Sequence, residues 1–410
     1  MTTATMTPGA HASSSEKAIS SRTILLSPID AWFFRDGRPY NSGESNQTDV
    51  ISLFPPPATT VVGALRAGLA RAKGWNGTSN WSTQREIADV LGDGFENLGR
   101  LHFHGPWLVR DGEFLFPMPL HVLGRPTPSA KSNEPQWQPA CLLTPDKNLT
   151  SCDLGDVCLP VTSGVRSQTF NPDGLKEPAN QWVTQAGMDL ILAGKLPMPE
   201  QVVDARDLWR FESRVGLERC ELTRTTKEGA LYSPRFVRLK RGVSLAMSVD
   251  GLPDDWQIPD LLPFGGENRL GDCRSSLEVA LAEVLRHAGS ELAIESRRPS
   301  RIAVTLLTPL LPGDAEAEKR TVAMVQPGEP FFNCEGTTVI SACVGKPLTL
   351  GGWNSLDRKP LDLRPVLPAG SVWFIEVSEA KITHFIMQAQ HGFGLKTRYG
   401  FGQVALGVWP

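Results

Sequence analysis

The part of the sequence best suited to chemistry is the C-terminal segment GFGLKTRYGFG, in which two GFG triplets enclose five residues. Its glycines are Gly392, Gly394, Gly400 and Gly402. Glycine adopts positive φ without strain and lets another chain approach, so this loop is suited to presenting amide N–H groups to phosphate. Lys396 and Arg398 add positive charge beside it. The rings of Phe393, Tyr399 and Phe401 are of the kind that stack on unpaired bases, at about 1–3 kcal/mol each. The pattern predicts a loop that binds RNA.

A structural alternative stays open for the same segment. A glycine-rich turn can simply join a helix to the last strand, with the aromatic side chains filling the core. A plain hairpin needs one or two glycines, so four of them favour binding. The loop has neither the GxGxxG spacing after a strand nor the GxxxxGK[ST] of a phosphate-binding P-loop. A nucleotide cofactor is therefore not expected.

Other basic residues extend the candidate RNA-binding set. Arg35 and Arg38 follow the first expected strand and are candidates for phosphate contacts, or else solvated turn residues. Arg224 lies in a middle block with Arg214 and Arg219 among polar threonines. That block suits an extended loop along RNA or along a partner, although spaced arginines also occur on ordinary wet surfaces.

An enzymatic interpretation rests on histidines. His391 directly precedes the glycine loop, where Lys396 and Arg398 would stabilise a pentacoordinate phosphate. His102 and His104 share one face of an expected strand, but no carboxylate or cysteine cluster nearby completes a metal site. The GGDD pattern of a polymerase palm and an adjacent His-Asp nuclease motif are both missing from the sequence. We expect no catalytic residue, metal or cofactor, and keep a metal-independent endoribonuclease and a protein-only scaffold as alternatives.

Length and composition indicate the class of protein. A chain of 410 residues predicts two domains, and 38 glycines with 33 prolines favour short strands and turns. The formal net charge of −3 means that RNA binding must come from local basic patches. Seven cysteines without a CxxC pair suit free thiols in a reducing compartment. With no signal peptide or membrane-spanning run, we expect a cytoplasmic protein with a disordered tail over residues 1–22.

The order of elements predicts an α+β fold. An apolar strand over residues 23–34, a proline stop, and a helix from about residue 61, capped by Thr59 or Thr60, open a ferredoxin-like βαββαβ unit. Asp111-Gly112 marks a hairpin, and residues 124–200 are interpreted as long excursions. Strands around a helix over residues 275–288 suggest a second such unit. We predict two ferredoxin-like, RRM-like domains over 23–210 and 211–410, the first with long loop insertions and the second with the glycine-rich loop 392–402.

The motifs also carry a family resemblance. The glycine loop resembles the signature loop of the RAMP superfamily of CRISPR proteins. PIDAWFFRDGRPY and FPPPATTVVGALRAGLA resemble the opening of the handle-binding (third) subunit of type III-B, or Cmr, effector complexes. The blocks ESRVGLERCELTRTTKEGALYSPRFVRL, FGGENR and KPLTLGGWN resemble internal segments of that subunit. The resemblance runs in patches from residue 24 to 410 and is weak across 124–200.

The resemblance implies a partner set and a role in antiviral defence. Such a subunit grips the repeat-derived 5′ handle of the crRNA and contacts the polymerase-like large subunit and the first backbone RAMP subunit. Single-stranded RNA of this kind is bound through its sugar-phosphate chain and its splayed bases. The type III-A equivalent is less favoured, because FFRDGRP and FPPP match the type III-B opening.

Overall fold

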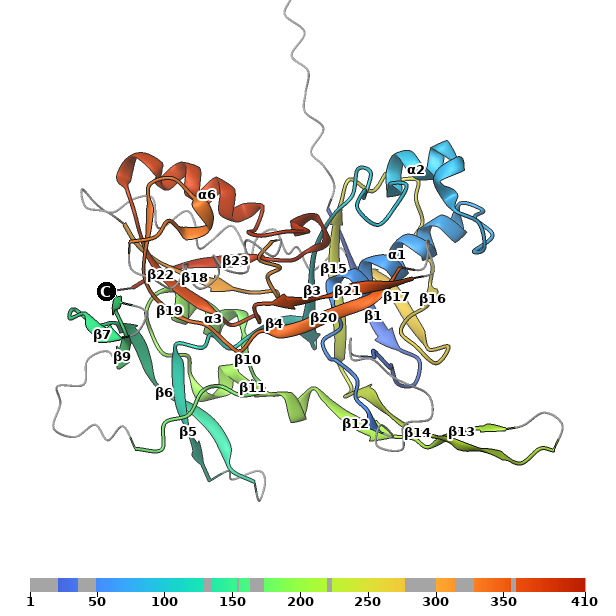
Figure 1. Cartoon of the computed structure of the whole chain (residues 1–410), viewed down its shortest axis with the longest axis horizontal. Helices are drawn as coiled ribbons and strands as arrows, with labels where there is room; N and C mark the ends of the chain where they lie inside the picture. Colours follow the sequence, from blue (N-terminus) through green and yellow to red (C-terminus); the bar gives the residue numbers. More distant parts are fainter. Residues whose placement is uncertain are drawn as a thin grey trace, which may run out of the picture.

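A computed structural model describes residues 21–35, 49–128, 134–152, 155–162, 173–219, 223–276, 300–313, 328–354 and 359–409. Two antiparallel sheets form the body, and helices pack against both of them (Figure 1). A two-stranded ribbon spans the region between them, and a long β-arm projects from the larger one. The expected mixture of helices and strands is confirmed.

The larger sheet is built around the first strand. In order across the sheet its strands are β11 (Val202–Asp204), β10 (Gln181–Thr184), β4 (Glu113–Pro117), β3 (His102–Arg110), β15 (Val243–Asp250), β1 (Arg22–Pro28), β17 (Leu270–Ser276) and β16 (Leu261–Pro263). In β1, Ile24 and Leu26 are fully buried. The helix α1 (Ala58–Ala72) packs on this sheet through Val61, Val62 and Leu65, which confirms the predicted helical spacing.

The predicted domain boundary between residues 210 and 211 does not separate the two sheets. Strand β15 pairs with both β1 and β3, and β17 pairs with β1. Residues 243–276, expected in the second unit, therefore complete the first sheet. The predicted cap of α1 is also wrong, because the helix begins at Ala58 after Pro57 and Thr59 and Thr60 lie inside its first turn.

The smaller sheet carries the glycine loop. Its strand order is β19 (Thr337–Cys343), β22 (Val372–Val377), β18 (Ser300–Leu306) and β23 (Val404–Val408). The helix α6 (Ile382–Gln390) covers one face through Phe385 and Ala389. The chain leaves α6, forms the glycine loop with the short helix η6 (Thr397–Tyr399), and enters β23. The helix predicted over residues 275–288 falls almost wholly outside the described residues.

The remaining strands form small sheets. The arm contains β12 (Trp209–Ser213), β14 (Thr226–Leu239) and β13 (Gly216–Arg219), with β2 (Asp49–Val50) parallel to β14. The ribbon consists of β20 (Leu348–Asn354) and β21 (Lys359–Val366). The segment expected to make excursions contains β5 (Val122–Thr127), β6 (Gln136–Pro145) and β9 (Pro160–Thr162), the pair β7 (Thr150–Cys152) and β8 (Gly155–Val157), and helix α3 (Gln185–Leu192). The hairpin predicted at Asp111-Gly112 joins β3 to β4.

The other helical segments are short. The helix α2 (Arg85–Leu91) lies beyond α1, and the 3₁₀ turns are η1 (Trp81–Thr83), η2 (Pro199–Gln201), η3 (Ala205–Asp207), η4 (Phe331–Asn333) and η5 (Glu379–Lys381). None of the helices in the described ranges is long and apolar enough to cross a membrane.

Candidate nucleic-acid interface

The four glycines of the loop adopt positive φ, as their spacing predicted. The angles are 78° at Gly392, 82° at Gly394, 98° at Gly400 and 67° at Gly402. A Cβ at Gly402 would overlap the carbonyl oxygen of Phe393, and one at Gly400 would overlap that of Gly105. The backbone that approaches these glycines is therefore the protein's own, and their absent side chains allow the loop to pack tightly against β3.

The aromatic side chains of the loop belong to the core. Phe393, Tyr399 and Phe401 are 2%, 4% and 1% exposed. The Tyr399 hydroxyl donates to the carbonyl oxygen of Phe95, and burial raises its pKa to about 12. The hypothesis that these three rings stack on unpaired bases is contradicted, because their faces are already covered by protein.

The two cations of the loop are held by the segment between α2 and β3. The Nζ of Lys396 lies 2.8 Å from both carboxylate oxygens of Glu96 and 4.1 Å from the centre of the Phe95 ring. The Arg398 guanidinium donates to the carbonyl oxygens of Gly99 and Leu101, each at 2.7 Å. Both side chains fasten the glycine loop to residues 95–101, and Arg398 keeps part of its surface in solvent.

A buried arginine organises that segment from the other side. Arg66, on α1, is 4% exposed. Its guanidinium donates to the carbonyl oxygens of Leu91, Gly94 and Asn97 at 2.9, 2.9 and 3.1 Å. These oxygens belong to the C-terminal end of α2 and the turn after it, where partial negative charge accumulates. Helix α1 is thereby connected through this segment to the glycine loop.

Next to this assembly lies an open groove of about 1080 Å³. Every segment whose sequence carried the family resemblance contributes to the walls, except the middle block over residues 212–239. Phe33, Phe34 and Arg35 enter from the N-terminal block, and Pro57, Thr59, Thr60, Gly63 and Ala64 from the start of α1. Gly265 and Gly266 come from FGGENR, Gly352, Trp353 and Asn354 from the ribbon, and Tyr399 from the glycine loop. Segments distant in sequence therefore form one concave surface.

The groove combines apolar rings with positive charge. Trp353 is 60% exposed, and the Arg71 guanidinium lies 5.2 Å above the Trp75 ring, which in turn packs edge-on against Trp81 at 4.9 Å. Arg35 is exposed at the rim. Exposed aromatic faces beside cations and glycine backbone suit an unpaired nucleic-acid strand, whose bases stack and whose phosphates need neutralising. Arg71, Trp75 and Trp353 were missed by the sequence analysis, although Trp353 lies in the GGWN block.

The predicted arginines are not all brought together. Arg35 lines the groove, whereas Arg224 is exposed in the turn between β13 and β14, on the arm. Arg38 lies outside the described residues. Arg269, the last residue of FGGENR, lies 3.4 Å from Asp30.

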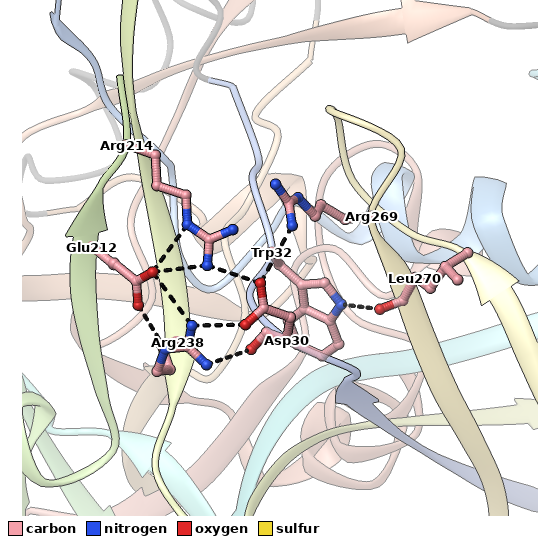
Figure 2. Close-up of polar contacts among 7 residues, drawn as sticks. All are labelled: Asp30, Trp32, Glu212, Arg214, Arg238, Arg269 and Leu270. Atoms are coloured by element: carbon pink, nitrogen blue, oxygen red, sulfur yellow. Dashed lines mark hydrogen bonds and ion pairs between the residues drawn. The ribbon is translucent and has the colours of Figure 1, made fainter. Parts of the chain in front are cut away.

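The base of the arm is a charged network (Figure 2). Asp30 also pairs with Arg214 at 2.8 Å and with Arg238 at 2.7 Å. Glu212 contacts the same two arginines at 2.7 and 2.6 Å. Next to Asp30, the buried Trp32 donates from its indole N–H to the Leu270 carbonyl oxygen. These contacts fix the N-terminal block to β12, β14 and the turn after FGG.

The histidines form a separate polar cluster beside the glycine loop. The rings of His102 and His104 stack at 4.6 Å, and His104 contacts the Asp250 carboxylate at 2.9 Å and Gln403 at 2.7 Å. Burial lowers the pKa of His102 to about 4, and the neighbouring His104 lowers it further as the next largest cause. His391 is exposed at the C-terminal end of α6 and does not line the groove. No group of three metal-ligating side chains occurs within the described ranges.

Comparison with known proteins gives a family match over nearly the whole chain. The family model described as CRISPR-associated protein (Cas_Cmr3) matches residues 24–409. No curated protein matches the sequence.

Solved structures with a similar fold are distant in sequence. A chain of the type III-B Cmr-beta complex bound to cognate target RNA and AMPPnP is 16% identical, with 89% of this chain and 88% of that one covered and a TM-score of 0.44. A chain of the same complex bound to cognate target RNA gives 16% identity, 89% coverage of both chains and a TM-score of 0.45. A chain of the Csm3-Csm4 subcomplex of a type III-A interference complex gives 10% identity, coverages of 86% and 92%, and a TM-score of 0.37.

Proposed function

The chain belongs to the Cas_Cmr3 family of CRISPR-associated proteins, and from this premise we propose that it is a non-catalytic subunit that holds the 5′ handle of the crRNA in its groove. The proposal places it in a type III-B effector, between the polymerase-like large subunit and the first backbone RAMP subunit. Its role is positional, because a held 5′ end fixes the register of the guide. Two ferredoxin-like units form part of the same proposal.

The observation that carries the proposal is the convergence of the family blocks on one groove. The N-terminal block, the start of α1, FGGENR, the ribbon and the glycine loop all contribute wall residues. A protein-only scaffold would not require an open groove with exposed Trp353 and with Arg35 at the rim. Such a surface matches the stacking and charge neutralisation that unpaired RNA needs.

The glycine loop has an indirect role in this account. Lys396 and Arg398 hold residues 95–101, and Tyr399 supports Phe95 at the groove wall. We propose that Gly392, Gly394, Gly400 and Gly402 act by allowing this close packing. Any phosphate contact by Arg398 would use the part of its guanidinium that remains exposed.

The test compares two apolar side chains of the ribbon. We expect Trp353→Ala in the full chain to weaken binding of labelled single-stranded handle RNA about tenfold, since stacking on one base contributes about 1–3 kcal/mol. Leu348→Ala is the matched control, because Leu348 is 46% exposed on the same strand but does not line the groove. Equal affinities for the two variants would contradict binding in the groove.

The same experiment separates the enzymatic alternative. RNA recovered after incubation is sized on a denaturing gel, and we expect it to remain intact. Specific cleavage that disappears in His391→Ala would make the chain a processing endoribonuclease and would overturn the non-catalytic proposal.

A further inference from the structure

The network at the base of the arm carries an excess of positive charge. It joins three guanidinium groups to two carboxylates, which leaves one net positive charge. Hydrogen bonds from Arg238 and Arg214 lower the pKa of Glu212 to about 2, and those from Arg214 and Arg238 lower the pKa of Asp30. Both carboxylates are therefore ionised near neutral pH, and the excess is constant there.

The three arginines differ in how many hydrogen bonds they donate to the two carboxylates. Arg238 directs its Nε and both terminal nitrogens at Glu212 and Asp30. Arg269 makes a single, long contact of 3.4 Å with Asp30 through Nη1 (Figure 2), and its Nε is buried without a hydrogen-bond acceptor among the described residues. The two terminal nitrogens of a guanidinium carry four of its five N–H donors, so Arg269 keeps donors at its terminal nitrogens for a ligand. Its side chain is 25% exposed.

Packing holds Arg269 in place while most of the donors on its terminal nitrogens have no partner among the described residues. Its guanidinium lies 4.4 Å above the centre of the Phe236 ring, and that of Arg214 lies 4.9 Å from the same ring. Stacking on an aromatic face leaves the N–H edge of a guanidinium available for hydrogen bonds. The group is thus oriented before any ligand arrives.

The network is adjacent to the groove. The Phe236 ring packs against Phe33 at 5.5 Å, and Phe33 lines the groove. Arg269 closes the turn that begins with Gly265 and Gly266, also wall residues, through a hydrogen bond from its backbone N–H to the Gly266 carbonyl oxygen. A strand that leaves the groove toward the arm would pass this turn.

We propose that Arg269, supported by Arg214, binds a phosphodiester of the RNA strand where it leaves the groove toward the β-arm, an inference that rests on the proposed RNA-binding function. Asp30 holds the site in the free protein and competes with the phosphate for Arg269. The ligand class is the nucleic-acid backbone, so the contact is independent of base sequence.

The experiment measures the affinity of the full chain for handle RNA as a function of salt. We expect Arg269→Gln to lower the slope of log K against log salt by about 0.7 and to weaken binding about tenfold at low salt. Asp30→Asn removes the competitor and should strengthen binding. Arg274→Gln is the control, because Arg274 is 78% exposed on β17, pairs with Asp272 and should leave both quantities unchanged.

Each other outcome has a defined meaning. If wild type binds RNA but Arg269→Gln behaves like Arg274→Gln, the phosphodiester site is overturned and the proposed function stands. If Arg269→Gln and Asp30→Asn both weaken binding without a change of slope, the network is only a brace for the arm, and the inference fails. Arg269→Lys keeps the charge and should retain the slope, which separates loss of contact from loss of fold. Absence of RNA binding by wild type would instead overturn the proposed function.

Discussion

Gly402 shows what a single residue contributes to this structure. Its φ of 67° and the closeness of the Phe393 carbonyl oxygen both exclude a Cβ. The doubled GFG pattern was sufficient to predict the positive φ values, because glycine is the residue that adopts them without strain. The pattern could not show what packs against the glycines. In the structure these neighbours are the backbone of Phe393 and of Gly105.

We expect Gly402→Ala to destabilise the protein strongly. A left-handed backbone costs a residue with a Cβ about 1–2 kcal/mol, and here an overlap with the Phe393 carbonyl adds to that cost. Gly112→Ala is the matched control, because Gly112 has a φ of 86° but open space around its Cβ position. Denaturant unfolding of both variants measures the difference, and equal losses would show that the loop can relax.

Lys396 and Arg398 show the same limit of the sequence analysis at the residue scale. Two cations in a glycine loop predicted phosphate contacts, whereas the structure gives them Glu96 and two carbonyl oxygens as partners. Those partners lie about 300 residues away in the chain, as the contact between Lys396 and Glu96 shows. No local pattern identifies these partners. The binding of Lys396 and Arg398 to RNA remains a prediction.

At the scale of elements, local patterns were reliable and pairings were not. The spacing of Val61, Val62 and Leu65 predicted α1, and Asp111-Gly112 predicted the hairpin between β3 and β4. The insertion of β15 between β1 and β3 depends on contacts across more than 200 residues to β1 and more than 130 residues to β3. Such a pairing is decided by the whole hydrophobic core. The boundary predicted at residue 210 therefore separates strands that pair in the structure.

Arg66 supports a prediction about how α1 holds its neighbours. Arg66→Leu should lower the free energy of unfolding by about 3 kcal/mol, because several carbonyl oxygens lose a charged donor inside the protein. Hydrogen exchange should also rise over residues 91–99. Arg85→Leu on α2 is the control, since Arg85 is 94% exposed and forms a 3.8 Å pair with Asp89. Similar losses in the two variants would mean that the buried contacts contribute little.

At the scale of the whole molecule, blocks that lie far apart in the sequence and resemble one family line the same groove. Each block is recognisable in the sequence, where the glycine loop together with Arg35, Arg38 and Arg224 is predicted to bind RNA. The structure assembles most of them around one concave surface, with the glycine loop as a support for its wall. Only the folded structure identifies three of the groove residues as candidates for RNA binding, because none of them forms a sequence motif of its own. They are the exposed Trp353 and the stacked pair Arg71 and Trp75.

The most direct test of the central claim is photo-crosslinking of handle RNA that carries 4-thiouridine to the full chain, assembled with its partner subunits, followed by peptide mapping. The account predicts intact RNA and crosslinks to peptides that line the groove, above all those containing Trp353, Trp75 and Arg35. Crosslinks confined to peptides outside the groove walls would contradict it.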